Sequence, residues 1–157
     1  AAGIDFSLNT FDEMAVQFID KYQPQSLNCR LYDGVVETLE YLKKQGTHLY
    51  ILSASERNNL LQQCEHFQIV KYFDEILGID NIHAGGKVDI AKEFMKKSKI
   101  NPKETIFVGD TLHDYEVSQA MGVGCRLVSC GHQSRSRLEQ AGVKIYHDIR
   151  GLKGEIK

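Results

Sequence analysis

Two aspartates, Asp110 and Asp114, follow the apolar run "TIFVG" and stand four positions apart in "GDTLHD". Ser53 follows a second apolar run, "LYIL", and Lys87 opens the segment "KVDIAKEF" between the two runs. Carboxylate oxygens can ligate Mg²⁺, which prefers oxygen ligands and keeps several waters. An ammonium and a hydroxyl with nearby backbone N–H groups can bind the oxygens of a phosphoryl group. Together these residues have the chemistry of phosphoryl transfer, which depends on positioning and charge neutralisation.

Each of these residues also has a simpler structural interpretation. Ser53 with Glu56 matches an S-x-x-E capping box, so one interpretation of Ser53 is a helix cap without any role in a site. Asp110 and Asp114 could complement the positive end of a helix dipole. Lys87 could be solvated, although a cation at a helix N-terminus is unfavourable unless an anion lies nearby. The "GGK" at Lys87 lacks the other residues of a phosphate-binding loop. Only the combination of residues points to a site.

The elements that must position these side chains alternate along the chain. Continuous apolar segments predict buried strands, and segments with helical spacing of apolar residues predict helices between them. The predicted strands cover residues 48–55, 74–79, 105–109, 124–130 and 143–146, and the predicted helices cover 35–46, 56–68, 87–99, 114–122 and 135–142. This alternation favours an α/β fold with a parallel sheet covered on both faces. Ligands of such sheets bind beyond the carboxyl ends of the strands, where Ser53 and the two aspartates fall.

Composition bounds the class of protein. The chain has 157 residues, 42% hydrophobic and 25% charged, which fits one soluble globular domain. The formal charge is −2 and no basic run suits nucleic acid or an anionic membrane, so we expect neither partner. The apolar runs are too short to span a bilayer, and we expect a cytoplasmic protein. The four cysteines form no C-x-x-C pair, which favours free buried thiols over a disulfide or a zinc site.

The order of these residues resembles the haloacid dehalogenase superfamily of hydrolases, and within it the phosphoglycolate phosphatase type. "YILSAS" is similar to the family's second motif, Lys87 to its third, and "IFVGDTLHD" to its fourth. The fourth is the most specific, because an apolar strand followed by G-D-x-x-x-D is uncommon by chance. The resemblance covers about residues 32–145. It implies a three-layer, Rossmann-like core with a helical cap.

The resemblance also implies a reaction and a role for each residue. The reaction would be Mg²⁺-dependent hydrolysis of a small phosphorylated metabolite, a phosphate monoester, through an aspartyl-phosphate. Ser53 and the Ala54 backbone would hold the phosphoryl group, and Lys87 would neutralise the group and the nucleophile. Asp110 would ligate Mg²⁺, and Asp114 would ligate it or orient its waters and Lys87. Ala54 replaces the asparagine that often follows the family's hydroxyl residue.

The family's first motif, D-x-D-x-T at the end of an apolar strand, would supply the nucleophilic aspartate and the general acid and base. The chain offers only Asp5 in "GIDFSLNT", a degenerate match. We expect instead that residues 1–30 are part of the cap and that residues 31–157 are a core without its first, central strand. Another chain or a cleaved or unobserved piece would supply that strand, and this chain alone would be inactive. Direct pairing of "LYILSA" with "TIFVG" would contradict this expectation.

Thr10 and Glu13 form a capping box before an amphipathic helix predicted at 11–23, which we assign to the cap. Two other functions stay open: a catalytically inactive relative that binds a partner, and dehalogenation or phosphoryl mutase chemistry on the same core. His132 and Gln133 follow a predicted strand and could face the crevice, but a surface loop with a helix cap at Ser134 is the favoured interpretation. His113 is expected to point elsewhere, because neighbouring positions on a helix face different sides.

Overall fold

A computed structural model describes residues 10–79 and 86–155, so Asp5 lies outside the described residues. The chain divides into two compact units, residues 1–32 and 33–157. In the first unit, α1 (Phe11–Ser26) begins at the predicted capping box, in which Thr10 accepts the N–H of Glu13 and Glu13 accepts the N–H of Thr10. The helix is longer than predicted because it continues through Pro24.

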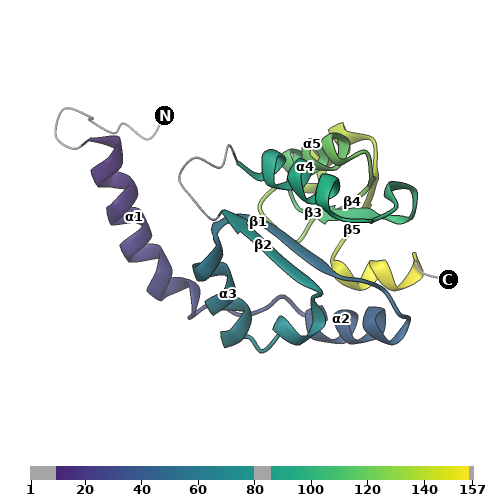
Figure 1. The fold of residues 1–157 in the computed structure, drawn as a ribbon, viewed down its shortest axis with the longest axis horizontal. Coiled ribbons are helices and arrows are strands. Elements are labelled where there is room, and N and C mark those ends of the chain that lie inside the picture. Colours follow the sequence, from purple (N-terminus) through teal and green to yellow (C-terminus); the bar gives the residue numbers. More distant parts are fainter. Residues whose placement is uncertain (1–9, 80–85, 156–157) are drawn as a thin grey trace. The chain divides into compact units, whose positions relative to one another are not determined.

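The second unit contains each predicted strand and helix in the predicted order (Figure 1). Its strands are β1 (Tyr50–Glu56), β2 (Glu75–Ile79), β3 (Ile106–Gly109), β4 (Gly124–Val128) and β5 (Lys144–Tyr146). Its α-helices are α2 (Val35–Lys44), α3 (Arg57–His66), α4 (Lys87–Lys97), α5 (Leu112–Met121) and α6 (Arg135–Leu138). Short 3₁₀ helices are η1 (Val70–Tyr72), η2 (Pro102–Glu104), η3 (Glu139–Ala141) and η4 (Ile149–Gly154). The helix predicted at 135–142 is therefore split between α6 and η3.

The strands form two parallel sheets, and "LYILSA" and "TIFVG" are not directly paired, as expected of a core without a strand between them. One sheet pairs β1 with β2, and the other has the order β3-β4-β5. In Figure 1, β1 and β2 run side by side in the same direction. Parallel pairing follows from the connections, because each successive strand is reached through a helical crossover. Within the described residues, β1 and β3 each pair along one side only.

The carboxyl end of β1 departs from regular pairing. Leu52 pairs with Leu77 and Glu56 pairs with Ile79, so the three residues 53–55 face the single residue Gly78 across a bulge. A Cβ on Gly78 would lie 2.8 Å from the carbonyl oxygen of Ser55, so the bulge needs a glycine there. Bulges re-aim side chains and free backbone groups from the ladder, and they are frequent beside active sites.

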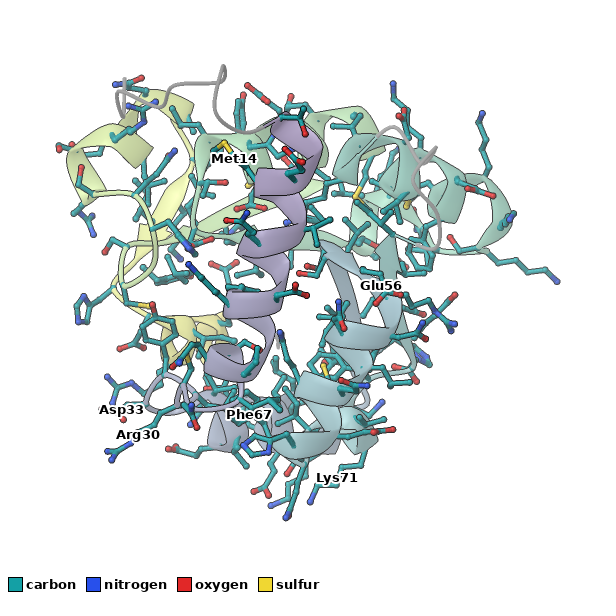
Figure 2. All side chains as sticks on the ribbon, turned by 90° about the vertical axis from the view of Figure 1, so that its left-hand side faces the viewer. Met14, Arg30, Asp33, Glu56, Phe67 and Lys71 are labelled. Atoms are coloured by element: carbon teal, nitrogen blue, oxygen red, sulfur yellow. The ribbon has the colours of Figure 1, made fainter. Side chains whose placement is uncertain are left out.

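The capping box predicted for Ser53 and Glu56 is wrong. Glu56 itself is the N-cap of α3, and its carboxylate accepts the N–H groups of Asn58 and Asn59 at 2.9 Å each. Those two hydrogen bonds lower the pKa of Glu56. Glu56 and Phe67 mark the two ends of this helix in Figure 2. Ser53 is therefore released from a capping role.

The core of the larger sheet is built on β4. Cys125 and Leu127 are two positions apart on this strand, so they face the same side, and both are buried against Leu138 of α6. All four cysteines are free thiols, as predicted, but only Cys64 and Cys125 are buried, whereas Cys130 is half-buried and Cys29 is exposed. In the described part of the chain, none of the helices has the length and apolar character that crossing a membrane requires.

Glu155 ties the C-terminal segment to the same sheet. Its carboxylate accepts hydrogen bonds from Arg126 at 2.9 Å, from Lys144 at 2.9 Å and from the hydroxyl of Tyr146. The side chain of Glu155 is only 14% exposed. Arg126, Tyr146 and Lys144 together hold the pKa of Glu155 far below its usual range.

Replacing this carboxylate should weaken the fold in a pH-dependent way. Glu155→Gln is expected to lower the free energy of unfolding at pH 7 by about 1–2 kcal/mol, because hydrogen bonds to a charged group are lost. The folded-state pKa lies below the unfolded value of about 4.3, so the stabilisation is complete well above that value and is lost as pH falls towards the folded pKa. Urea titrations from pH 7 to pH 3 should show the two proteins converging below about pH 4.

The control is Glu139→Gln, which removes an exposed pair with Arg135 at 3.4 Å. This change should have little effect at any pH, because exposed ion pairs contribute little. A Glu155→Gln defect that stays constant down to pH 3 would contradict the role of the Glu155 charge.

Candidate active site

The centre of the site is an ion pair between α4 and α5. The Nζ of Lys87 lies 2.5 Å from Oδ1 of Asp114, and the two side chains are 18% and 5% exposed. Lys87 is the first residue of α4, where a cation needs an anion nearby, and Asp114 supplies it. The same ammonium lies 5.3 Å from the centre of the Phe107 ring on β3. The pair therefore joins α4 to both α5 and β3.

The second oxygen of Asp114 accepts three hydrogen bonds. Oδ2 accepts the N–H of Asp110 at 3.0 Å, the N–H of Thr111 at 3.0 Å and the hydroxyl of Thr111 at 2.7 Å. Thr111 is the N-cap of α5 and forms a capping box with Asp114. The interpretation of Asp114 as a helix cap is thus correct for one oxygen, while the other binds Lys87. Burial raises the pKa of Asp114, but the bonds from Lys87 and Thr111 outweigh it and lower the pKa overall.

The glycine of "GDTLHD" has a steric reason. A Cβ on Gly109 would lie 2.2 Å from the Cβ of Asp114 and 2.3 Å from its Cγ. The first turn of α5 can therefore fold back over the end of β3 only when residue 109 has no side chain. The absence of a side chain at Gly109 allows the Asp114 carboxylate to lie at the end of β3.

Asp110 is engaged on one oxygen only. Its Oδ2 accepts the backbone N–H of His132 at 2.7 Å and lies 2.7 Å from the ring Nδ1 of the same residue. The Asp110 side chain is 30% exposed. Among the described residues, no hydrogen bond to its Oδ1 is formed. Within the part of the chain that the structure describes, Oδ1 of Asp110 is therefore available for another ligand.

The loop after β4 contributes more than the sequence indicated. His132 is exposed, as expected of a surface loop, yet it binds Asp110, and Gln133 Oε1 accepts the N–H of Leu112 at 2.9 Å. Ser134 is the N-cap of α6, but its side chain makes no capping hydrogen bond. The signal that could have identified this loop is the glycine at 131 followed by polar side chains after a strand. His113 points away, as predicted, and its ring lies 2.9 Å from Glu116.

Ser53 lies towards the same end of its sheet as Lys87, without touching it. The rings of Tyr50 on β1 and Phe94 on α4 are 5.1 Å apart. Ser53 is three residues further along β1, and Lys87 is seven residues back along the returning helix α4. Both steps correspond to about 10 Å. The Ser53 hydroxyl accepts the N–H of Ser55 at 3.1 Å, and none of the hydrogen bonds of the described residues joins Ser53 or Ala54 to Lys87 or the aspartates.

The structure thus unites Lys87, Asp110 and Asp114 through direct contacts and leaves Ser53 and Ala54 on a neighbouring bulge. Mg²⁺ is usually held by one or two carboxylates, with waters and phosphate oxygens completing its shell. Asp110 fits that pattern as one anchor. In residues 10–79 and 86–155, no group of three or more His, Cys, Asp or Glu side chains is arranged to hold a metal ion.

Comparison with known proteins decides the family. A sequence model of the haloacid dehalogenase-like hydrolase family matches residues 5–128, most of the chain, and includes Ser53, Lys87 and both aspartates. The chain belongs to this family. The match was expected from the resemblance of "YILSAS", Lys87 and "IFVGDTLHD". In the structure, "YILSAS" lies in β1, Lys87 begins α4, and "IFVGDTLHD" runs from β3 into the first turn of α5.

The curated relatives include several phosphoglycolate phosphatases. Phosphoglycolate phosphatase 1 of Pseudomonas aeruginosa is 27% identical over 137 residues, which cover 86% of this chain and 50% of that protein. The phosphoglycolate phosphatase of Pseudomonas fluorescens is 29% identical over 160 residues, covering 97% of this chain and 58% of that protein. The chain therefore spans little more than half the length of these relatives.

Solved structures of phosphatase-like proteins share the fold of this chain. A predicted phosphatase from Clostridium acetobutylicum superposes with a TM-score of 0.84 at 24% identity, over 96% of this chain and 74% of that one. A predicted phosphoglycolate phosphatase from Haemophilus somnus gives a TM-score of 0.79 at 26% identity, over 94% of this chain and 68% of that one. The arrangement of helices and parallel strands is thus that of a haloacid dehalogenase-like hydrolase.

The Lys87–Asp114 pair should behave as one coupled unit. Lys87→Met or Asp114→Asn alone is expected to cost about 3 kcal/mol of unfolding free energy, because each leaves a poorly solvated polar partner. The double variant should lose less than the sum, with a coupling of about 1–3 kcal/mol. Urea denaturation of the four proteins in a double-mutant cycle measures the coupling.

Glu93 and Lys97 provide the matched control cycle. Their atoms are also 2.5 Å apart, but the side chains are 64% and 75% exposed. Their coupling should stay below about 0.5 kcal/mol. Equal coupling energies for the two pairs would show that burial adds nothing to the Lys87–Asp114 contact.

Proposed function

We propose that this chain carries part of the active site of a Mg²⁺-dependent phosphatase that hydrolyses a small phosphate monoester. The observation that carries the proposal is the Lys87–Asp114–Asp110 group, in which an ammonium and a carboxylate oxygen meet at the end of a parallel strand. Family membership and the names of the relatives support the same activity. Phosphoglycolate is the first substrate to test, because it is the compound in those names.

In this proposal the residues divide the work of binding and charge neutralisation. Asp110 would hold Mg²⁺, which would supply positive charge near the phosphoryl oxygens. Lys87 neutralises the phosphoryl group and the nucleophile. Asp114 orients Lys87 through its Oδ1, while its Oδ2 accepts three hydrogen bonds, so Asp110 is the first choice of anchor and Asp114 would ligate Mg²⁺ or orient its waters. Ser53 and the N–H of Ala54 bind the phosphoryl oxygens from the bulge of β1.

The nucleophile is proposed to be an aspartate outside this chain, on a strand that pairs between β1 and β3. The support is that these strands belong to separate sheets and each pairs on one side only among the described residues. Unpaired backbone N–H and C=O groups in a core are costly, so a strand with two partners would satisfy both edges. Residues 1–30 would be part of a helical cap, and the intact enzyme would work in the cytoplasm.

Activity of the full-length protein tests the metal anchor. With Mg²⁺ and phosphoglycolate, Asp110→Asn should reduce kcat by roughly 100-fold or more, because a preorganised charge at the reacting phosphoryl group is lost. Asp89→Asn is the matched control, since Asp89 is an exposed carboxylate in the first turn of α4. It should retain wild-type activity. Equal activity of wild type and Asp110→Asn would exclude Asp110 as the anchor.

Hydrogen exchange tests the strand between the sheets. Peptides covering β1 and β3 should exchange more slowly in the full-length protein than in the 157-residue chain, because a paired edge protects its amides. The 157-residue chain should also lack phosphatase activity. Identical exchange of β1 and β3 in the two proteins would contradict the proposed strand.

A further inference from the structure

The loop after β4 contacts Asp110 with two donors from a single residue. The backbone N–H of His132 and its ring Nδ1 both lie 2.7 Å from Oδ2 of Asp110. The terminal torsion of an aspartate is normally broad, so a carboxylate with one weak contact can rotate. Two donors on one oxygen restrict that rotation and fix where the other oxygen points.

The residue before His132 makes the contact possible. A Cβ on Gly131 would lie 2.0 Å from Oδ2 of Asp110 and 2.5 Å from its Cβ. The φ of Gly131 is not in the left-handed region, unlike that of Gly122 or Gly142. Gly131 is therefore needed for space and not for its backbone conformation.

The loop begins on rigid elements. Gly109, the residue before Asp110, pairs with Leu127 on β4, so the two strands deliver Asp110 and the loop to the same edge. Ser129 then donates its N–H to the carbonyl of Tyr146 on β5 at 3.0 Å. A contact held by paired strands is better defined than one between free loops.

We propose that Gly131 and His132 form a carboxylate clamp, which orients Asp110 so that its Oδ1 is presented to the divalent cation. His132 is a positioning residue in this inference, because it acts through Asp110. The inference rests on the proposed function, in which Asp110 is the metal anchor. Among the described residues, both His132 donors contact Oδ2 of Asp110, which leaves Oδ1 as the oxygen that the clamp would present.

Divalent-cation binding tests the clamp without relying on activity. The full-length protein is titrated with Mn²⁺ in the absence of substrate, free Mn²⁺ is followed by electron paramagnetic resonance, and Mg²⁺ competition is measured. His132→Leu keeps the backbone donor and removes the ring donor, so its dissociation constant should rise about 10-fold, as is usual when the partner of a metal ligand is removed. Gly131→Ala should raise it at least as much, because the added methyl group displaces the carboxylate.

A conservative variant separates positioning from a structural role. The side-chain amide of His132→Asn can donate from nearly the position of ring Nδ1, so its dissociation constant should stay within about threefold of wild type. His113→Leu is the matched histidine control, since His113 also contacts a carboxylate, that of Glu116. Gly154→Ala is the matched glycine control, because a Cβ there meets no atom within 4 Å. Both controls should bind Mn²⁺ like wild type.

Asp110→Asn separates the clamp from the function on which it rests. Wild-type Mn²⁺ affinity in Asp110→Asn would overturn Asp110 as the anchor and the clamp with it. Lost affinity in Asp110→Asn, with wild-type affinity in His132→Leu or Gly131→Ala, would overturn the clamp alone. Equal losses in His132→Asn and His132→Leu would likewise overturn the role of the ring donor, and unchanged melting temperatures would show that the variants are folded.

Discussion

The Lys87–Asp114 ion pair is the interaction on which the arrangement of the site depends. Lys87 stands at the start of α4, where the helix dipole disfavours a cation, and it is largely buried. Asp114 offsets both costs with one oxygen and caps α5 with the other. The Lys87 ammonium, which we propose neutralises the phosphoryl group, is therefore held by the same carboxylate that fixes the first turn of α5 and the backbone of Asp110. Asp114 thus contributes both to the proposed site and to the stability of α5.

The sequence was sufficient for the elements of the core and for their order. Strongly apolar strands and capped helices are local features, and the residues at strand ends follow from the rule that ligands bind at the carboxyl ends of parallel strands. The position of Lys87 at a helix N-terminus called for a nearby anion, and the family resemblance implied that Asp114 could orient Lys87. The S-x-x-E pattern made Ser53 the N-cap and Glu56 its partner three residues later. In the structure Glu56 is itself the N-cap, and only the backbone conformation distinguishes these two arrangements.

The features that the sequence missed are non-local. His132 contacts a residue 22 positions away, and no periodicity or spacing encodes that contact. The division into two sheets is also non-local, because it depends on which strands pair and not on where strands occur. The family resemblance, and not the pattern of the residues, led to the expectation that β1 and β3 would not be neighbours.

Gly109 and Gly131 are required because they have no β-carbon. Each lies against an aspartate so closely that a single β-carbon would overlap the carboxylate or its stem. Neither glycine has a side chain that could bind a substrate or an ion. In a survey of substitutions scored by activity, both positions would nevertheless rank with the charged residues as intolerant, and alanine would be as harmful there as a bulky side chain. Such intolerance would report the space around two carboxylates rather than any chemistry of the glycines themselves.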